Sequence, residues 1–146
     1  MQRLPLTLAV LVSINSWTSC TATKTSCDGL VYKAEGLTRA EYLPCAGEMI
    51  GALDRLRPDL EAVVQGDKGA RSKARNEYDN FRSLLRSAGG RNLVERWADE
   101  DLNRLNLRIW NASTSYDAVL LYPNPTDLRA AEDSHDEAKN IYNSLR

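Results

Sequence analysis

After residue 38, apolar residues recur every three or four positions, which is the spacing of one face of an α-helix. Glycine and proline residues divide this pattern into four segments. No stretch alternates apolar and polar residues for long enough to predict a sheet, so the pattern predicts an all-α protein. The predicted inward stripes are Met49, Leu53, Leu56, Leu60 and Val63; Ala74, Tyr78, Phe81, Leu85 and Ala88; Ala98, Leu102, Leu105, Ile109, Ala112, Tyr116 and Val119; and Leu128, Ala131, His135, Ala138, Tyr142 and Leu145.

The first segment has two candidate starting points. Thr38 and Glu41 have the spacing of a capping box, whereas Pro44 would suit the first position of a helix that began there. Pro58 interrupts the apolar stripe without shifting its phase, and this predicts a kink within one continuous helix. We therefore expect the first helix to start near Thr38, with Pro44 as the alternative start.

Turn and cap residues mark the other boundaries. Residues 65–69 predict a turn, and Gly89 suits the left-handed conformation that commonly ends a helix. Asn92 is predicted to cap the third helix, and the fourth is predicted to begin at Thr126, after Pro125. Because connections of about four to six residues join antiparallel neighbours, the expected fold is a four-helix up-down-up-down antiparallel bundle.

The first residues of the chain predict export. Arg3 supplies one positive charge, and residues 4–14 follow as an uncharged apolar run. A run of this length is typical of a signal-peptide core and is shorter than the ~20 residues that a spanning helix needs. The mature chain is therefore expected outside the cytoplasm, where disulfides persist.

The cysteine that follows the apolar run is predicted to be lipidated. The sequence SWTSC, which ends at Cys20, resembles a bacterial lipobox, although Trp17 is unusual three places before the cysteine. Lipidation of Cys20 would follow removal of residues 1–19 as a signal peptide. It would anchor the chain at the periplasmic face of a bacterial membrane. The alternative is cleavage after Ala22, which would give a soluble periplasmic or secreted protein.

Either processing event leaves an even pair of cysteines, Cys27 and Cys45, in an oxidising compartment. We expect them to form a disulfide. The disulfide would tether an N-terminal segment, residues 20–37, to a single helical domain, residues 38–146. One domain is the expectation for a chain of 146 residues.

Charge and motif content exclude several classes of function. The chain has 19 Lys and Arg against 20 Asp and Glu, so it has no basic patch for nucleic acid. Contact with a membrane is expected only through the N-terminal lipid. The single histidine, His135, and Glu132 have the spacing of one half of a di-iron motif, but the second half is missing. We therefore expect no metal, no cofactor and no enzymatic activity, and we interpret His135 as a partly buried imidazole at a bundle end.

One group of apolar residues lies outside the predicted core. Leu93, Trp97, Leu107, Trp110 and Leu121 fall outside the inward stripe of the third helix. Tryptophan is a common anchor at interfaces, so Trp97, Leu107 and Trp110 form a candidate interaction patch. The alternative is that residues 28–37 fold back and cover this face with Leu30, Val31 and Tyr32. We expect such cover for Leu107 and Trp110, with the edge near Trp97 still available to a partner.

Two functions remain open from the sequence. The first is an exported, lipid-anchored envelope protein that acts as a non-enzymatic interaction, scaffold or inhibitor module, with an envelope protein or a second copy as its partner. The alternative is a periplasmic carrier that binds an apolar small molecule between helices. The predicted core contains many alanines, which let helices pack closely and argue against a roomy cavity. This favours the first function.

Overall fold

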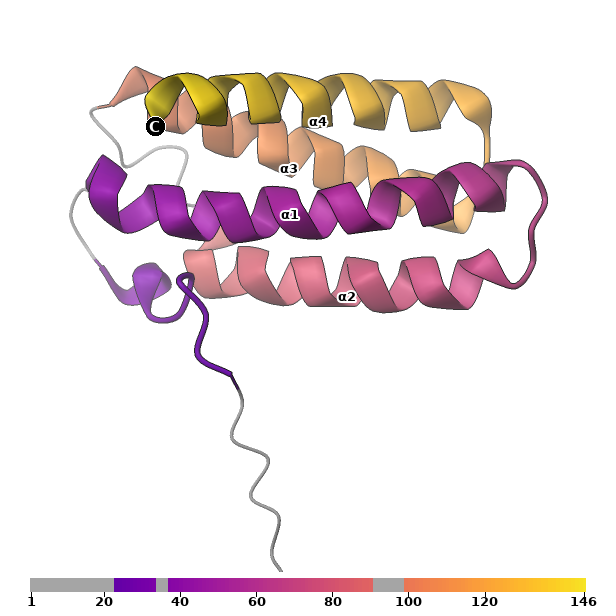
Figure 1. Ribbon diagram of the computed structural model, residues 1–146, viewed down its shortest axis with the longest axis horizontal. Helices are drawn as coiled ribbons and strands as arrows, with labels where there is room; N and C mark the ends of the chain where they lie inside the picture. Colours follow the sequence, from indigo (N-terminus) through magenta and orange to yellow (C-terminus); the bar gives the residue numbers. More distant parts are fainter. Residues whose placement is uncertain (1–22, 34–36, 91–98) are drawn as a thin grey trace, which may run out of the picture.

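The computed structural model describes residues 23–33, 37–90 and 99–146. These residues form four α-helices, a short 3-10 helix and no strand: η1 (Leu30–Tyr32), α1 (Arg39–Val64), α2 (Ala70–Ala88), α3 (Glu100–Leu121) and α4 (Pro125–Leu145). The four α-helices lie side by side with their axes nearly aligned, and in this view α1 runs between α2 and α4 (Figure 1). The predicted all-α class and the helical bundle are confirmed.

The start of α1 follows from its capping box. The Thr38 hydroxyl accepts a hydrogen bond from the backbone N–H of Glu41, and the Glu41 carboxylate accepts one from the backbone N–H of Thr38 at 3.0 Å. These two bonds satisfy donors that the first turn of a helix leaves free. The helix then continues without interruption through Pro44 and Pro58. The start at Thr38 is confirmed, and the alternative start at Pro44 is wrong.

Local cap chemistry also sets the other helix ends. Gly89 ends α2 with a φ of 102°, a conformation that residues with a Cβ rarely adopt, as predicted. The prediction that Asn92 caps the third helix is wrong, because α3 begins at Glu100 with Asp99 as its cap, and residue 92 itself lies outside the described residues. Helix α4 begins one residue before the predicted Thr126, after the cap Asn124.

The predicted apolar stripes form the core. Every stripe residue of α1, α2 and α3 is buried, apart from Ala98, which lies outside the described residues. In α4, the stripe is buried from Leu128 to Ala138, whereas Tyr142 and Leu145 are half-buried at its end. The α1 helix contacts the other three helices, and the largest contacts join α1 to α2 and α3 to α4.

The N-terminal segment is fixed to the outside of the bundle by the predicted disulfide. Cys27 and Cys45 are bonded, with their Cα atoms 4.7 Å apart, and both are fully buried. The backbone N–H of Ser26 donates to the Glu48 carboxylate at 2.9 Å, and η1 packs against α2. The disulfide therefore holds this segment on the α1–α2 side of the molecule. Across the described parts of the chain, no helix is both long and apolar enough to cross a membrane.

Candidate functional site

The outward face of α3 carries apolar side chains that the core does not use. Leu107 is 40% exposed and Leu121 is 55% exposed, while Trp110 is half-buried at the edge of the core. The structure thus places two residues of the predicted interaction patch, Leu107 and Trp110, on one face of one helix. Trp97, the third, lies outside the described residues, as does Leu93.

The N-terminal segment does not cover this face. Of the three residues expected to cover it, Leu30 is buried in the core cluster, whereas Val31 is 39% exposed and Tyr32 is 87% exposed. The prediction that these side chains shield Leu107 and Trp110 is therefore wrong. The reason is the position of the disulfide, which fixes the segment beside α1 and α2 instead of α3.

A continuous stripe without charge runs along this face, and we call it the outer stripe. Its members are Leu107, Trp110, Asn111, Thr114, Ala118 and Leu121. Between Leu107 and Leu121 the only charged residues are Arg108 and Asp117. Both reach sideways to neighbouring helices: Arg108 pairs with Glu137 on α4 at 2.9 Å, and Asp117 lies 3.9 Å from Arg75 on α2. The charges border the stripe, so its middle, at Asn111 and Thr114, is polar but uncharged.

Two shallow hollows flank Trp110. One, of about 300 Å³, lies between α2 and α3 and has Arg82, Arg86 and Asp117 in its lining. The other, of about 470 Å³, lies along α3 and α4. The second hollow contains no charged residue, and its lining is Leu107, Trp110, Asn111, Thr114, Ser115, Ala130 and Ser134. Trp110 thus lines both hollows and lies between them, so a partner surface could contact it from two sides.

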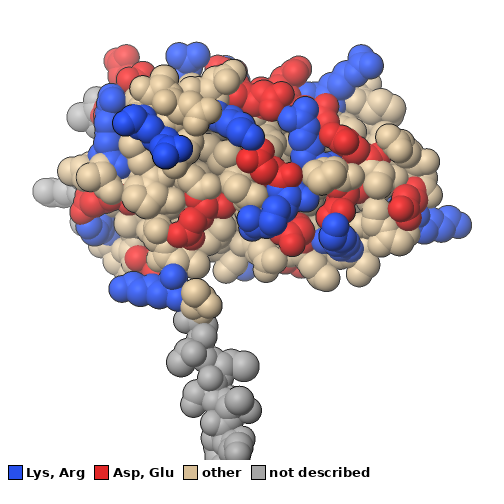
Figure 2. Space-filling model, in the orientation of Figure 1, with Lys and Arg blue, Asp and Glu red and all other residues tan. Residues whose placement is uncertain are grey.

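A third, larger groove of about 880 Å³ crosses α1 between α2 and α4. Gly47 and Gly51 form its floor, and a Cβ at Gly47 would come within 2.5 Å of the Tyr142 hydroxyl. Basic and acidic side chains are mixed over the face that carries α1 (Figure 2). Asp54, Arg55 and several other charged residues line the groove, so its character is mixed, unlike that of the outer stripe.

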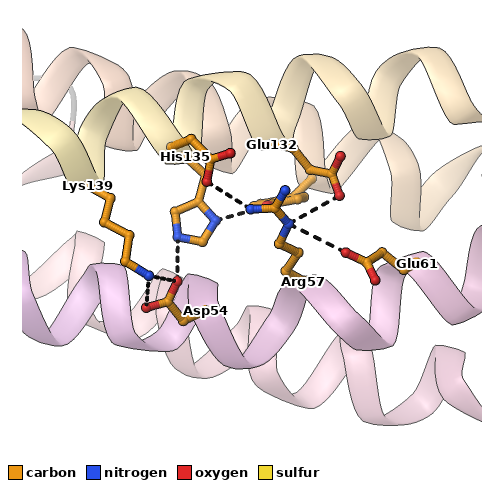
Figure 3. Close-up of polar contacts among 8 residues, drawn as sticks. Asp54, Arg57, Glu61, Glu132, His135 and Lys139 are labelled. Atoms are coloured by element: carbon orange, nitrogen blue, oxygen red, sulfur yellow. Dashed lines mark hydrogen bonds and ion pairs between the residues drawn. The ribbon is translucent and has the colours of Figure 1, made fainter.

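The seam between α1 and α4 holds a cluster of polar groups around His135 (Figure 3). His135 is fully buried, and its Nδ1 lies 3.0 Å from the hydroxyl of Tyr116 on α3. Its Nε2 lies 3.2 Å from Asp54 Oδ1, although the geometry is not that of a hydrogen bond. Lys139 donates to both oxygens of Asp54 at 2.9 and 3.0 Å. His135 lies in the middle of α4, so the prediction of a partly buried imidazole at a bundle end is wrong.

Arg57 occupies the neighbouring part of the seam. It pairs with Asp136 at 2.8 Å, with Glu132 at 3.2 Å and with Glu61 at 3.5 Å. Glu132, which has the sequence spacing of a metal ligand relative to His135, is therefore held by an arginine. Among residues 23–33, 37–90 and 99–146, no group of three or more His, Cys, Asp or Glu side chains is placed to hold a metal ion.

Burial sets the protonation states in this seam. It lowers the pKa of His135 below the usual 6.5, against the opposing effect of the Asp54 charge, so the imidazole is neutral at pH 7. Burial also raises the pKa of Tyr116. Asp54, His135 and Tyr116 contact one another in series, but Tyr116 is fully buried and its raised pKa keeps the hydroxyl protonated. The arrangement fits a structural role in joining three helices.

Other buried polar residues were not anticipated from the sequence. Asn106 is fully buried and accepts a hydrogen bond from the Tyr42 hydroxyl at 2.8 Å. Ser113 is buried, and its carbonyl accepts one from Tyr78 at 3.2 Å. Buried Asp59 pairs with Lys73 at 2.9 Å. Each lies three or four residues from a core position on its own helix, and that spacing could have identified it.

Comparison of the chain with models of protein families, with characterised proteins and with solved structures finds no match.

Proposed function

We propose that this chain is an exported, lipid-anchored envelope protein that acts as a non-enzymatic interaction module, either a scaffold or an inhibitor. The observation that carries the proposal is the outer stripe of α3, where leucines and a tryptophan remain accessible in a neutral band. Burying such groups gains free energy only when a partner covers them. A half-buried tryptophan between two hollows has the features of an interface anchor.

Export and lipidation rest on the N-terminal residues. Arg3, the apolar run of residues 4–14 and the sequence before Cys20 support a signal peptide of residues 1–19. These positions lie outside the described residues. The Cys27–Cys45 disulfide agrees with an oxidising compartment. Mass spectrometry of the mature N-terminus tests the proposal: an acylated Cys20 is expected as the first residue, and an unmodified chain starting at Thr23 would exclude it.

For the topology, we propose the order up-down-up-down. The connection from α1 to α2 and that from α3 to α4 are short, and each joins helices that pack extensively on one another. Short connections favour antiparallel neighbours. An antiparallel α3–α4 pair is consistent with the contact of Arg104, in the second turn of α3, with Glu137, in the second half of α4, at 3.3 Å.

The test of the interaction function is capture of an envelope protein by the immobilised full chain. Leu107→Glu should abolish specific capture, because a carboxylate would have to be buried in an apolar contact. Val31→Glu is the matched control, since Val31 is 39% exposed and Leu107 is 40% exposed. If the wild type and Leu107→Glu retain the same proteins, the outer stripe is not the interaction surface.

The groove across α1 supports a second function, that of a small-molecule carrier. Its volume of about 880 Å³ is within the range of ligand sites, which is roughly 300–1,000 Å³. It is open and bordered by charged residues, which fits an apolar ligand poorly. Gly51→Leu would fill the groove floor, since only Arg55 lies within 4 Å of a Cβ there. Loss of binding of a fluorescent apolar probe in that variant, but not in Leu107→Glu, would favour the carrier.

A further inference from the structure

Helix α2 differs from the other helices in its charge. It has five basic residues against two acidic ones, whereas α1 has three against five and α4 has two against five. At about 100° per residue, four of the basic residues of α2 fall within about 60° of one another around the helix. We call this set the basic face, and its members are Arg71, Arg75, Arg82 and Arg86. The near balance of charge over the whole chain therefore hides a cationic surface.

The arginines of the basic face lack the ion pairs that the other helices make. Every arginine of α1 and α3 lies 3.3 Å or less from a carboxylate, namely Arg39, Arg55, Arg57, Arg104 and Arg108. On the basic face Arg75 lies 3.9 Å from Asp117, and the other three have no acidic partner in the part of the chain that the structure describes. Asp79 is exposed one turn from Arg75, so four arginines stand beside one carboxylate of their own helix.

The first described residues of the chain lie against the same helix. The 3-10 helix η1 packs on α2, and the Cys27–Cys45 disulfide holds the segment there. From η1 this segment runs to the side of the bundle opposite α4 (Figure 1). Cys20 is three residues before Thr23, which is at most about 10 Å of extended chain. An acyl chain on Cys20 would therefore turn α2, and not α4, toward the membrane.

We propose that the basic face of α2 binds the anionic phospholipid headgroups of the membrane that holds the chain. The orientation rests on the proposed lipid anchor, whereas the charge of α2 is independent of it. An acyl chain and a cationic surface are two signals that together give stable attachment to a membrane. Guanidinium groups suit this role, because they donate paired hydrogen bonds to phosphate oxygens. The expectation of contact through the lipid alone rested on total charge, which does not show how the charges are distributed.

Vesicle binding by the mature chain with Cys20→Ser tests the proposal without the anchor. Vesicles of phosphatidylglycerol and phosphatidylcholine in equal parts should bind this chain at about 0.1 M salt and release it at about 1 M, where charges are screened beyond about 3 Å. Vesicles of phosphatidylcholine alone should bind it at least about tenfold more weakly. Flotation of the vesicles measures both. Equal binding to the two compositions would overturn the proposal.

Two matched substitutions separate the basic face from the net charge of the chain. Arg82 on α2 and Arg129 on α4 are both exposed, and neither has an acidic partner among the described residues. Each basic group near an anionic surface strengthens binding roughly fivefold, so Arg82→Glu should weaken binding to the anionic vesicles about tenfold or more. Arg129→Glu changes the net charge equally and should weaken binding less than about twofold. Equal losses would mean that binding follows net charge alone, and the basic face would be excluded.

Nitroxide labels on the lipidated chain measure which helix faces the bilayer. Asn76→Cys on α2 and Asn140→Cys on α4 each replace an exposed asparagine and supply the labelling sites. In vesicles with nickel-chelating headgroups, the label at position 76 should relax faster than the label at position 140, because nickel acts only at short range. Equal relaxation of the two labels would overturn the proposed orientation.

The remaining outcomes distinguish the lipid from other partners and from the anchor. If Arg82→Glu binds anionic vesicles like the wild type but loses an acidic protein that the wild type retains, the basic face binds that protein and the proposal is wrong. If Cys20 carries no acyl chain but Arg82→Glu still releases the vesicles, the lipid anchor is excluded and the binding of headgroups by α2 stands.

Discussion

The α1–α4 seam and the outer stripe of α3 contain the two kinds of residue that helical periodicity leaves unexplained. The seam buries polar groups: His135 is fully buried between Tyr116 and Asp54. The outer stripe exposes apolar ones, with Leu107 and Leu121 facing water. A buried polar group costs free energy unless it finds a partner, whereas an exposed apolar group only forgoes the gain of burial.

In the seam the compensation lies inside the chain. Tyr116 bonds His135, Lys139 bonds Asp54, and Arg57 joins carboxylates from α1 and α4. These partners come from three helices, so the contacts form together only when the helices take this one arrangement. In the outer stripe no such partner exists within the described residues, because η1 packs on α2 instead. The exposed leucines of the outer stripe therefore remain in contact with water in this part of the chain.

The largest expected effect comes from comparing two aromatic residues of α3: Tyr116 in the seam and Trp110 in the outer stripe. Tyr116→Ala should destabilise the chain by about 3–5 kcal/mol, because it leaves a cavity and removes the partner of His135. Trp110→Ala should cost roughly half as much, because Trp110 is only half-buried. Both substitutions place alanine in the same helix, so helix propensity hardly contributes to the difference. Equal losses in urea unfolding would show that Trp110 is a core residue.

Reduction of the Cys27–Cys45 disulfide should cost about 3 kcal/mol, since it opens a loop with a sequence separation of 18 residues. The effect should be confined to the α1–α2 side. In a Trp17→Phe, Trp97→Phe background, the emission of Trp110 should keep its wavelength on reduction. A red shift would mean that the N-terminal segment shields the outer stripe after all.

Acidification should weaken the seam and leave the outer stripe unaffected. Burial lowers the pKa of His135 below 6.5, so the unfolded chain takes up a proton before the folded chain does. Stability is therefore complete above pH 6.5 and falls as the pH drops toward the folded pKa. The urea midpoint should decrease from pH 7.5 to 5.5 in the wild type, and less so in His135→Gln. A midpoint that rises on acidification would instead mean that a charged imidazole pairs with Asp54.

Sequence periodicity was sufficient for most of the fold. The stripes of α1, α2 and α3 were predicted correctly where they are described, because burial along a helix depends mainly on spacing. The boundary of α3 was not, because Asn92 and Asp99 are both good caps by local chemistry. Arg39, sixty residues from Asp99 in the chain, bonds the Asp99 carboxylate at 2.6 Å. Such a contact cannot be read from neighbouring residues.

The candidate site was predictable only in part, because helical spacing indicates which residues face outward but not which segments cover them. The outward position of Leu107 and Trp110 follows from their phase on the helix. Whether another segment covers them depends on where the disulfide lies in space, and this the sequence does not specify. His135 was interpreted as partly buried at a bundle end, because its partners Tyr116 and Asp54 lie 19 and 81 residues away in the chain. Spacing along a helix can indicate that a polar group is buried, but the partner that satisfies it is concealed by sequence distance.

The smallest expected effect is at Thr114, and its buried neighbour Ser113 provides the contrast. Thr114 is exposed at the centre of the outer stripe, whereas Ser113 is buried beside Tyr78. Thr114→Arg should change the stability of the monomer by less than about 0.5 kcal/mol, because its side chain extends into water. Ser113→Arg should unfold the chain or cost well over about 3 kcal/mol, because a guanidinium would be buried without a partner. Urea unfolding measures both. A large loss for Thr114→Arg would mean that the outer stripe belongs to the core of a single chain, and the contrast between the two regions would no longer hold.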